Sequence, residues 1–349
     1  MPDGVVTWAL AVEGVLAAVT LAWLVAVAGA RALRRRRDTG RSALAREAMT
    51  RASLGEPQAH DDLAALARVG TDARIELLAA SGRNFSGKAR MRHAALAETA
   101  GVVADAEARC RSRRWWRRLQ GVRLLTLTGA VSAQSAALLS DRNAEVRAAA
   151  ATCSADHPEP DLDRLIAMLD DESPLCRFAA KSSLVRIGGP VVAPLARRLA
   201  ATPGGRIDEV MEVAAGVADA RLLPAAIELA RHPSPRTRAL AAAIAGAVGG
   251  AAAIEALKRL LFDPDSTVRA AAAAGLGKLA HWPAAPELAA ALGDRAWEVR
   301  RSVALALRSL GPTGLVMLRE SLHDPDRFAR DMAQQVLGLP ASASRAGVA

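Results

Sequence analysis

Side chains that could take part in catalysis are few, and their spacing matches no known catalytic arrangement. Six histidines occur, and none belongs to an HExxH motif or to a repeated His–Glu pair that could bind a metal. Adjacent carboxylates stand at Asp61-Asp62 and Asp170-Asp171, where we expect them to cap helices rather than to act as acid and base. The sequence has no P-loop and no nucleophile elbow. We therefore expect a non-catalytic protein with no catalytic, cofactor-binding or metal-binding residue and no small-molecule substrate.

The cysteines also predict no special chemistry. Cys110, Cys153 and Cys176 are odd in number and lack CxxC spacing, so they indicate neither a disulfide framework nor a zinc site. We expect all three to be small buried apolar residues.

An arginine and an aspartate are the charged residues that recur. The arginine returns at intervals of 30, 61, 31, 31 and 30 residues, and 61 is two periods. In five copies an aspartate stands six residues before it, and in the sixth copy His232 takes that place. Such residues at turns can form ion pairs and helix caps, so we expect a structural ladder between neighbouring turns. Its members are Asp141, Arg147, Asp171, Arg177, Arg238, Asp263, Arg269, Asp294, Arg300, Asp324 and Arg330.

Each period predicts the same pair of helices. Residues 251–280 read as an amphipathic first helix, the turn Asp-Pro-Asp-Ser, and a second helix that is apolar on most faces. The copy centred near residue 208 keeps the helical pattern but has Asp208 where the arginine should be, and Arg117 falls in register before the clear copies. We expect about nine helical hairpins between residues 60 and 337.

The repeated residues resemble a known family. Leu-x-Asp before the turn, Val-Arg-x-x-Ala-Ala in the second helix and a closing Leu-Gly, over residues 139–188 and 230–338, are similar to HEAT repeats. The similarity is to the short form of about 30 residues found in phycobilin-lyase-type HEAT-like proteins, here of a membrane-anchored bacterial type. This resemblance implies an all-α fold, a right-handed α-solenoid of stacked helical hairpins whose curved face binds partners. It implies no catalytic residue.

The N-terminal region predicts one transmembrane helix ahead of the solenoid. Residues 5–30 carry a single charge, Glu13, and are long enough to span a bilayer. Arginines follow at once, which places the N-terminus outside and the solenoid in the cytoplasm, at the inner membrane. A cleaved signal peptide is the alternative, but no Lys or Arg precedes Val5. The predicted parts are a transmembrane anchor (1–30), a basic juxtamembrane segment (31–59), the solenoid (60–337) and a disordered tail (338–349).

Charge is concentrated next to this predicted anchor. Residues 31–120 hold 20 Lys and Arg against 10 Asp and Glu, whereas residues 121–349 hold 26 against 24. This distribution predicts contact with anionic lipid near residues 31–37 and argues against a nucleic-acid partner. Candidate contacts with membrane or partner are Arg34, Arg35, Arg36, Arg37, Trp115 and Trp116.

The adjacent tryptophans at 115 and 116 have two interpretations. Trp115 and Trp116, flanked by four arginines, either contact a membrane or partner, or form an inter-repeat turn with one indole packed inside. Trp282 and Trp297 occupy ordinary repeat positions, and we expect them to be packing residues.

These observations favour a membrane-anchored scaffold or regulatory protein that binds a protein partner, such as an integral membrane protein, at the cytoplasmic face. One alternative is a nucleic-acid-binding HEAT-like solenoid, which would need basic residues along the whole array. A further alternative is an enzyme of the bilin lyase or isomerase type, which only the repeat subtype suggests.

Overall fold

The computed structural model of the chain describes residues 45–47, 50–54, 71–82, 85, 87–130, 132–201 and 206–339. Every regular element in these ranges is helical, and none is a strand, as the composition predicts. The predicted transmembrane helix, the four arginines at 34–37 and residues 340–349 of the predicted tail lie outside the described ranges. Within those ranges, no helix is both long enough and apolar enough to cross a bilayer.

The chain forms two compact units, one ending at Ser135 and one beginning at Ala136. In the first unit, described helical residues at 45–47 and 50–54 precede four longer helices. These are α3 (Thr71–Gly82), α4 (Gly87–Thr99), α5 (Val102–Cys110) and α6 (Trp115–Thr128).

A buried histidine links three segments of the first unit. His93 on α4 has no exposed surface, and its Nε2 lies 3.0 Å from the carbonyl oxygen of Leu78 on α3. Its Nδ1 lies 3.3 Å from the Ser53 hydroxyl. Burial lowers the pKa of the His93 imidazole below its ordinary value. A neutral ring that donates from Nε2 and accepts at Nδ1 satisfies both contacts.

The second unit is a row of helical pairs in which a shorter first helix, often extended by a 3₁₀ turn, precedes a longer second helix. α7 (Ala133–Ala137) lies at the boundary between the units. The first helices that follow, with their 3₁₀ turns, are η1 (Leu138–Ser140), α9 (Leu162–Ala167), η2 (Met168–Asp170), η3 (Gly189–Val191), α11 (Val192–Ala200), η4 (Ala220–Leu222), α13 (Leu223–Leu229), α15 (Ala251–Leu260), η5 (Trp282–Ala284), α17 (Ala285–Ala290), η6 (Ala291–Gly293), α19 (Pro312–Glu320) and η7 (Ser321–His323). The second helices are α8 (Ala144–Ser154), α10 (Pro174–Ile187), α12 (Ile207–Val217), α14 (Pro235–Val248), α16 (Ser266–Lys278), α18 (Trp297–Ser309) and α20 (Arg327–Leu337).

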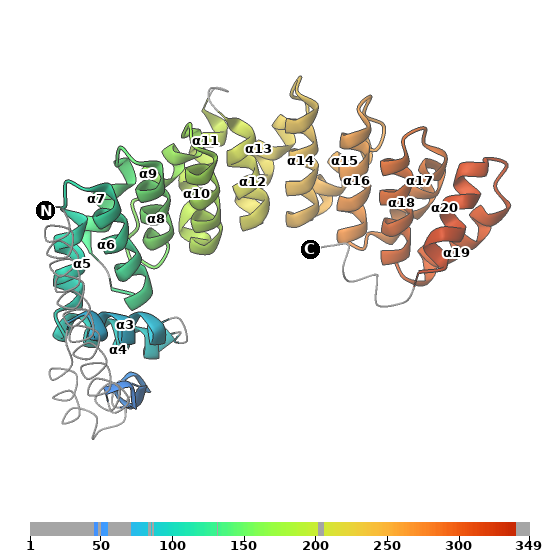
Figure 1. The fold of residues 1–349 in the computed structure, drawn as a ribbon. Helices are drawn as coiled ribbons and strands as arrows, with labels where there is room; N and C mark the ends of the chain where they lie inside the picture. Colours follow the sequence, from blue (N-terminus) through green and yellow to red (C-terminus); the bar gives the residue numbers. More distant parts are fainter. Residues whose placement is uncertain are drawn as a thin grey trace, which may run out of the picture. The chain divides into compact units, whose positions relative to one another are not determined.

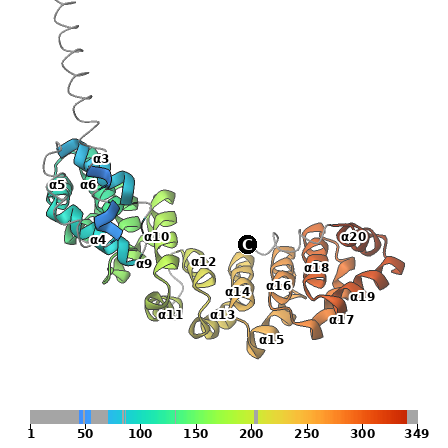
Figure 2. The same ribbon diagram turned by 90° about the horizontal axis from the view of Figure 1, so that it is seen from below.

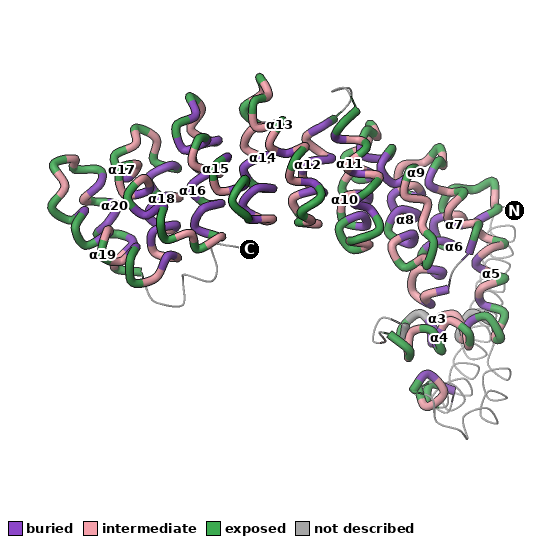
Figure 3. The backbone as a smooth tube through the Cα atoms, turned by 180° about the vertical axis from the view of Figure 1, so that it is seen from behind, coloured by how far each residue is buried: buried purple, intermediate pink, exposed green. Residues whose placement is uncertain are grey.

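Helices of the second unit form two layers. Each second helix packs against the second helix of the next pair, from α8 through to α20. Figure 1 shows this succession from green to red, and Figure 2 shows α11, α13, α15, α17 and α19 along the opposite side of the row. We call these the second-helix layer and the first-helix layer. Buried residues, purple in Figure 3, lie where neighbouring helices face one another.

Local sequence explains where the second helices begin and end. The side chains of Asn143 and Asp265 accept backbone N–H groups at the starts of α8 and α16. Pro235 occupies the first turn of α14, where its missing N–H costs nothing. Gly249 follows α14 at φ 77°, a positive φ that glycine adopts without strain.

Small residues allow the second helices to approach closely. A Cβ added at Gly246 would lie 2.5 Å from the Cα of Gly275, and one added at Gly277 would lie 2.7 Å from the Cα of Ala306. Only glycine fits at either contact, so these residues set the spacing of α14, α16 and α18. Cys110, Cys153 and Cys176 are all buried, as the sequence predicts.

The C-terminal pair ends the described array with a polar face. Asp331, Gln334 and Gln335 of α20 are exposed, while Ala333 and Val336 are buried. An exposed polar face of this kind is typical of the terminal repeat of a solenoid.

Candidate interaction surface

Three arginines of the repeat each hold the aspartate of the next turn through two parallel hydrogen bonds. Nε lies 2.7–2.8 Å from Oδ2, and Nη2 lies 2.8–2.9 Å from Oδ1. We call each such pair a rung, and the rungs are Arg147–Asp171, Arg238–Asp263 and Arg269–Asp294. This two-pronged geometry matches the planar guanidinium to a carboxylate and adds orientation as well as attraction.

Each rung is also tied to its own turns. Nη1 of the arginine donates to two carbonyl oxygens of the preceding turn; for Arg269 these belong to Asp263 and Pro264. The aspartate in turn accepts a backbone N–H two residues ahead, as Asp294 does from Ala296. His232 accepts the equivalent N–H through Nδ1, which explains how it replaces the aspartate. A rung therefore fixes two turns and their separation at once.

The electrostatics of the rungs follow from these contacts. The Arg147 guanidinium, through its hydrogen bonds, holds the pKa of the Asp171 carboxyl below its ordinary value. For Asp294, burial alone would raise the pKa, but hydrogen bonds from Arg269 and Ala296 outweigh burial and lower it. Both carboxylates are therefore charged at neutral pH.

The ladder changes where the degenerate copy lies. Arg177 makes the usual contacts with its own turn but pairs with Glu209 of α12, 3.0 Å away. Lys181 binds both Glu209 and Glu212, which extends the pair into a network. Asp208, at the arginine's place, accepts the Thr237 hydroxyl at 2.8 Å. Glu209 is not among the residues predicted from the sequence, and its signal there is the acidic first turn of α12.

The next expected pair, Arg300 with Asp324, forms no ion pair in the described part of the chain. We call this pair the open rung. Arg300 donates to the carbonyls of Asp294 and Arg295, and Arg330 to those of Asp324 and Pro325. Among the described residues, however, Arg300 forms no ion pair, and its Nε has no hydrogen-bond partner. Its guanidinium instead lies 4.6 Å from the centre of the Phe328 ring.

One sequence assignment is wrong by a residue. Arg118, not Arg117, donates Nη1 to the carbonyls of Ser112 and Arg113, six and five residues earlier. Those are the contacts of a ladder arginine with its own turn. The offset arises because Arg118 stands 29 residues before Arg147, whereas we extended a period of 30.

The tryptophans are more exposed than packing residues would be. Trp282 and Trp297 keep 63% and 54% of their surface exposed, so the prediction that they pack inside is wrong. They stand at the starts of η5 and α18, where the side chain leaves the core. Trp115 and Trp116 begin α6 at 41% and 44% exposure, with the Arg114 guanidinium 5.1 Å from the Trp116 ring. Neither indole is buried.

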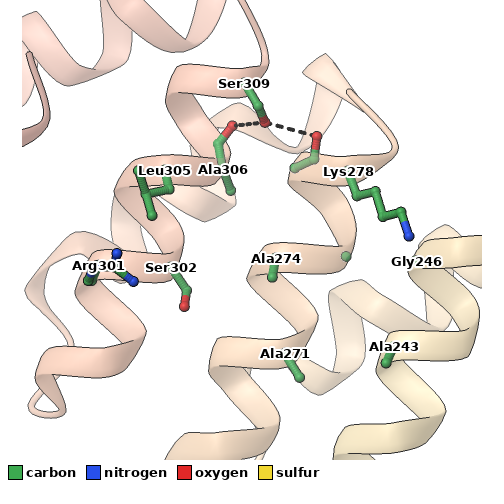
Figure 4. Close-up of a pocket in the computed structure, with 12 residues that line it drawn as sticks. Ala243, Gly246, Ala271, Ala274, Lys278, Arg301, Ser302, Leu305, Ala306 and Ser309 are labelled. Carbon is green, nitrogen blue, oxygen red and sulfur yellow. Dashed lines mark hydrogen bonds between the residues drawn. The ribbon is translucent and has the colours of Figure 1, made fainter. Parts of the chain in front are cut away.

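A groove crosses the second-helix layer over α14, α16 and α18. It encloses about 340 Å³, at the lower end of typical ligand pockets of about 300–1,000 Å³. Figure 4 shows the side chains of its small residues and the three helices that carry them. Its floor is formed by Ala243, Gly246, Ala271, Ala274, Gly277 and Ala306.

Larger side chains stand at the α18 side and the ends of the groove. Leu305 and Ser302 line it from α18, Arg301 stands beside them, and Lys278 extends from the end of α16 (Figure 4). The Ser309 hydroxyl is occupied, because it donates to the carbonyls of Gly277 and Ala306. In the described part of the chain, no cluster of His, Cys, Asp or Glu could hold a metal.

A second apolar feature lies in the same layer. Leu175, Phe178 and Val185 on α10 are 50%, 68% and 38% exposed. Counted from the ladder arginine, Phe178 takes the position that Arg301 takes on α18, and Val185 that of Gly246 on α14. The register therefore puts this apolar ridge on the face that carries the groove.

Comparison with known sequence families decides what the repeats are. The HEAT repeats family matches residues 133–214, 208–277 and 260–338, which together span more than half of the chain. The chain belongs to the HEAT-repeat family. The matched HEAT repeats include the degenerate copy around α12, whose motif the sequence lacks but whose helices it keeps. No protein of curated function matches.

Solved structures resemble the HEAT array only distantly. Escherichia coli YibA is 19% identical with a TM-score of 0.40, covering 68% of this chain and 92% of its own. Human deoxyhypusine hydroxylase is 22% identical with a TM-score of 0.29, covering 67% and 94%. The CpcE–CpcF complex of phycocyanin lyase from Nostoc is 18% identical with a TM-score of 0.35, covering 71% and 94%. At these values the likenesses carry no inference about activity.

Proposed function

We propose that this HEAT-repeat protein is a membrane-anchored scaffold or regulatory protein, without catalytic activity, that binds a protein partner at the cytoplasmic face of the membrane. The groove over α14, α16 and α18 carries the proposal. It is a recessed, mostly apolar surface on helices whose turns are fixed by bidentate rungs, so it presents a preformed site. Preformed sites lose little conformational entropy on binding.

The membrane part of the proposal comes from the sequence. An apolar run of 26 residues followed by an arginine cluster is typical of a single-pass anchor with its C-terminal part in the cytoplasm. Anionic lipid beside Arg34–Arg37 would hold the juxtamembrane segment near the surface. Confinement to the membrane raises the local concentration of the groove for a partner in the same membrane, so a weak contact is sufficient.

A groove-filling variant tests the binding site. Ala274 is exposed on the groove floor, so Ala274→Trp should fill the groove without disturbing the core. Ala252→Trp places the same side chain on an exposed position of α15, in the first-helix layer, and is the matched control. We expect a membrane protein that co-purifies with the full-length protein to be lost with Ala274→Trp and retained with Ala252→Trp.

Two results would contradict the proposal. If both variants retained the co-purifying membrane protein equally, the groove would not be its binding site. Membranes are also washed with carbonate, with a version lacking residues 1–38 as the comparison. If the full-length protein were recovered in the soluble fraction like the truncated version, the predicted membrane anchor would be wrong.

A further inference from the structure

The charged residues that line the groove share one sign. Lys278 and Arg301 are both exposed, and no acidic side chain lines the groove. This is unusual for this part of the chain, because residues 121–349 as a whole are close to charge balance. The groove is therefore a local positive site on a nearly neutral surface.

Neither cation is neutralised by the protein itself. In the part of the chain that the structure describes, Lys278 and Arg301 belong to no ion pair. Neighbouring bases behave differently: Lys258 pairs with Glu287 at 3.0 Å, and Arg269 pairs with Asp294. The Arg301 guanidinium lies 5.8 Å from the centre of the Trp297 ring. Two cations kept apart from the ion-pair network are available to an anionic partner.

The floor of the groove is small at positions where packing does not require it. Gly246 and Gly277 are fixed by the helix contacts described above, but Ala243 and Ala274 are exposed. At the equivalent position α18 carries Leu305 and α10 carries Ser182, so the repeat tolerates larger residues there. The exposed alanines leave apolar room between Lys278 and Arg301 (Figure 4).

We propose that the groove binds an acidic segment of a partner protein, in which a bulky apolar side chain enters the alanine floor and flanking Asp or Glu side chains pair with Lys278 and Arg301. This inference rests on the proposed function and names the partner's chemistry. An apolar anchor needs the floor, and the flanking carboxylates need the two cations. A phosphate backbone would use the cations but leave the apolar floor empty.

A peptide selection tests the partner's charge directly. The full-length protein in detergent, immobilised, is offered a pool of peptides that share a central Leu or Phe and carry random Glu, Lys or Ser at the flanking positions. We expect the bound pool to be enriched in Glu at least tenfold over Lys, and this preference to weaken as salt is raised. The double variant Lys278→Glu/Arg301→Glu should reverse the preference.

Control variants separate the charge of the groove from the net charge of the protein. The double variant Arg231→Glu/Arg259→Glu changes the net charge of the protein by the same amount as Lys278→Glu/Arg301→Glu. Arg231 follows α13 and Arg259 lies on α15, both are exposed, and this variant should leave the preference for Glu unchanged. Ala274→Trp should abolish enrichment of any peptide.

The outcomes distinguish the inference from the function beneath it. Enrichment that Ala274→Trp abolishes, but without preference for Glu, would overturn the acidic partner and leave the groove as a binding site. If the wild-type protein enriched no peptide relative to Ala274→Trp, both the acidic partner and the groove as a binding site would be overturned. Binding of a single-stranded DNA oligonucleotide that Lys278→Glu/Arg301→Glu abolishes, with no peptide enriched, would assign the cations to phosphate instead.

Discussion

Arg269 and Asp294 stand 25 residues apart in the sequence and meet through two hydrogen bonds, Nε to Oδ2 at 2.7 Å and Nη2 to Oδ1 at 2.9 Å. Arg269 simultaneously binds two carbonyls of its own turn. Both side chains are about nine-tenths buried. A buried pair with all of these contacts is costly to break from one side, because the remaining charge then has no partner.

The open rung allows this cost to be measured within one protein. Asp294→Asn removes the charge opposite Arg269 but keeps an oxygen for the Ala296 N–H, and we expect it to lower the free energy of unfolding by about 3 kcal/mol. Asp324→Asn makes the same change one repeat later, where Arg300 forms no ion pair, and should cost less than about 1 kcal/mol. Hydrogen exchange in α18 and α20 reports both effects. Equal losses would mean that the ion pair contributes little to the rung.

Acid should weaken the same rungs. The pKa values of Asp171, Asp263 and Asp294 are held below their ordinary value of 3.8 in the folded protein. The unfolded chain therefore takes up protons first, so the stabilisation is complete above about pH 4 and is lost as the pH falls through the folded values. Unfolding followed by circular dichroism between pH 6 and pH 2 measures this loss. Asp294→Asn should show a smaller slope than the wild type, and an unchanged slope would contradict the assignment.

The close helix contact at Gly246 gives a packing prediction. Gly246→Ala would bring a Cβ to 2.5 Å from the Cα of Gly275, so α14 and α16 must separate, at a cost of about 1–3 kcal/mol. Gly189→Ala is the matched control, because nothing lies within 4 Å of its added Cβ. Thermal unfolding compares the two, and a Gly246→Ala protein as stable as the wild type would show that the contact is looser than described.

His93 predicts a separate pH effect in the first unit. Its pKa lies below the ordinary value of 6.5 because burial disfavours the charged ring. The unfolded chain therefore binds the proton first, and the stability of α4 should fall as the pH drops below about 6.5 towards the folded value. Hydrogen exchange of α4 at pH 7.5 and pH 5.5, corrected for intrinsic rates, measures the change. His93→Gln should remove the dependence.

The periodic parts of the fold were predictable from sequence because each repeat must place the same residue types at the same turn. The spacing of Arg238, Arg269 and Arg300 predicted the helical pairs, which the structure and the family match confirm. Glu209 was not predictable in the same way, since it replaces the missing aspartate from a helix rather than from a turn. The spacing of repeated residues does not predict a local replacement of this kind.

The groove was also beyond sequence reasoning. Alanine is frequent throughout this chain and is the best helix former, so the exposed Ala243 and Ala274 have no distinguishing signal. The prediction that Trp282 and Trp297 pack inside was wrong for a related reason. A position in the repeat predicts the helix but not whether a side chain of its first turn faces the core. These features depend on which side chains neighbouring helices bring together.

In each of the three rungs the arginine precedes its aspartate, by 24 or 25 residues. During synthesis from the N-terminus, an arginine such as Arg238 binds the carbonyls of its own turn as soon as its helix has formed, but its carboxylate partner is added only with the following turn. We therefore expect each rung to close only after the following turn has been synthesised, so that the rungs form in the order of translation.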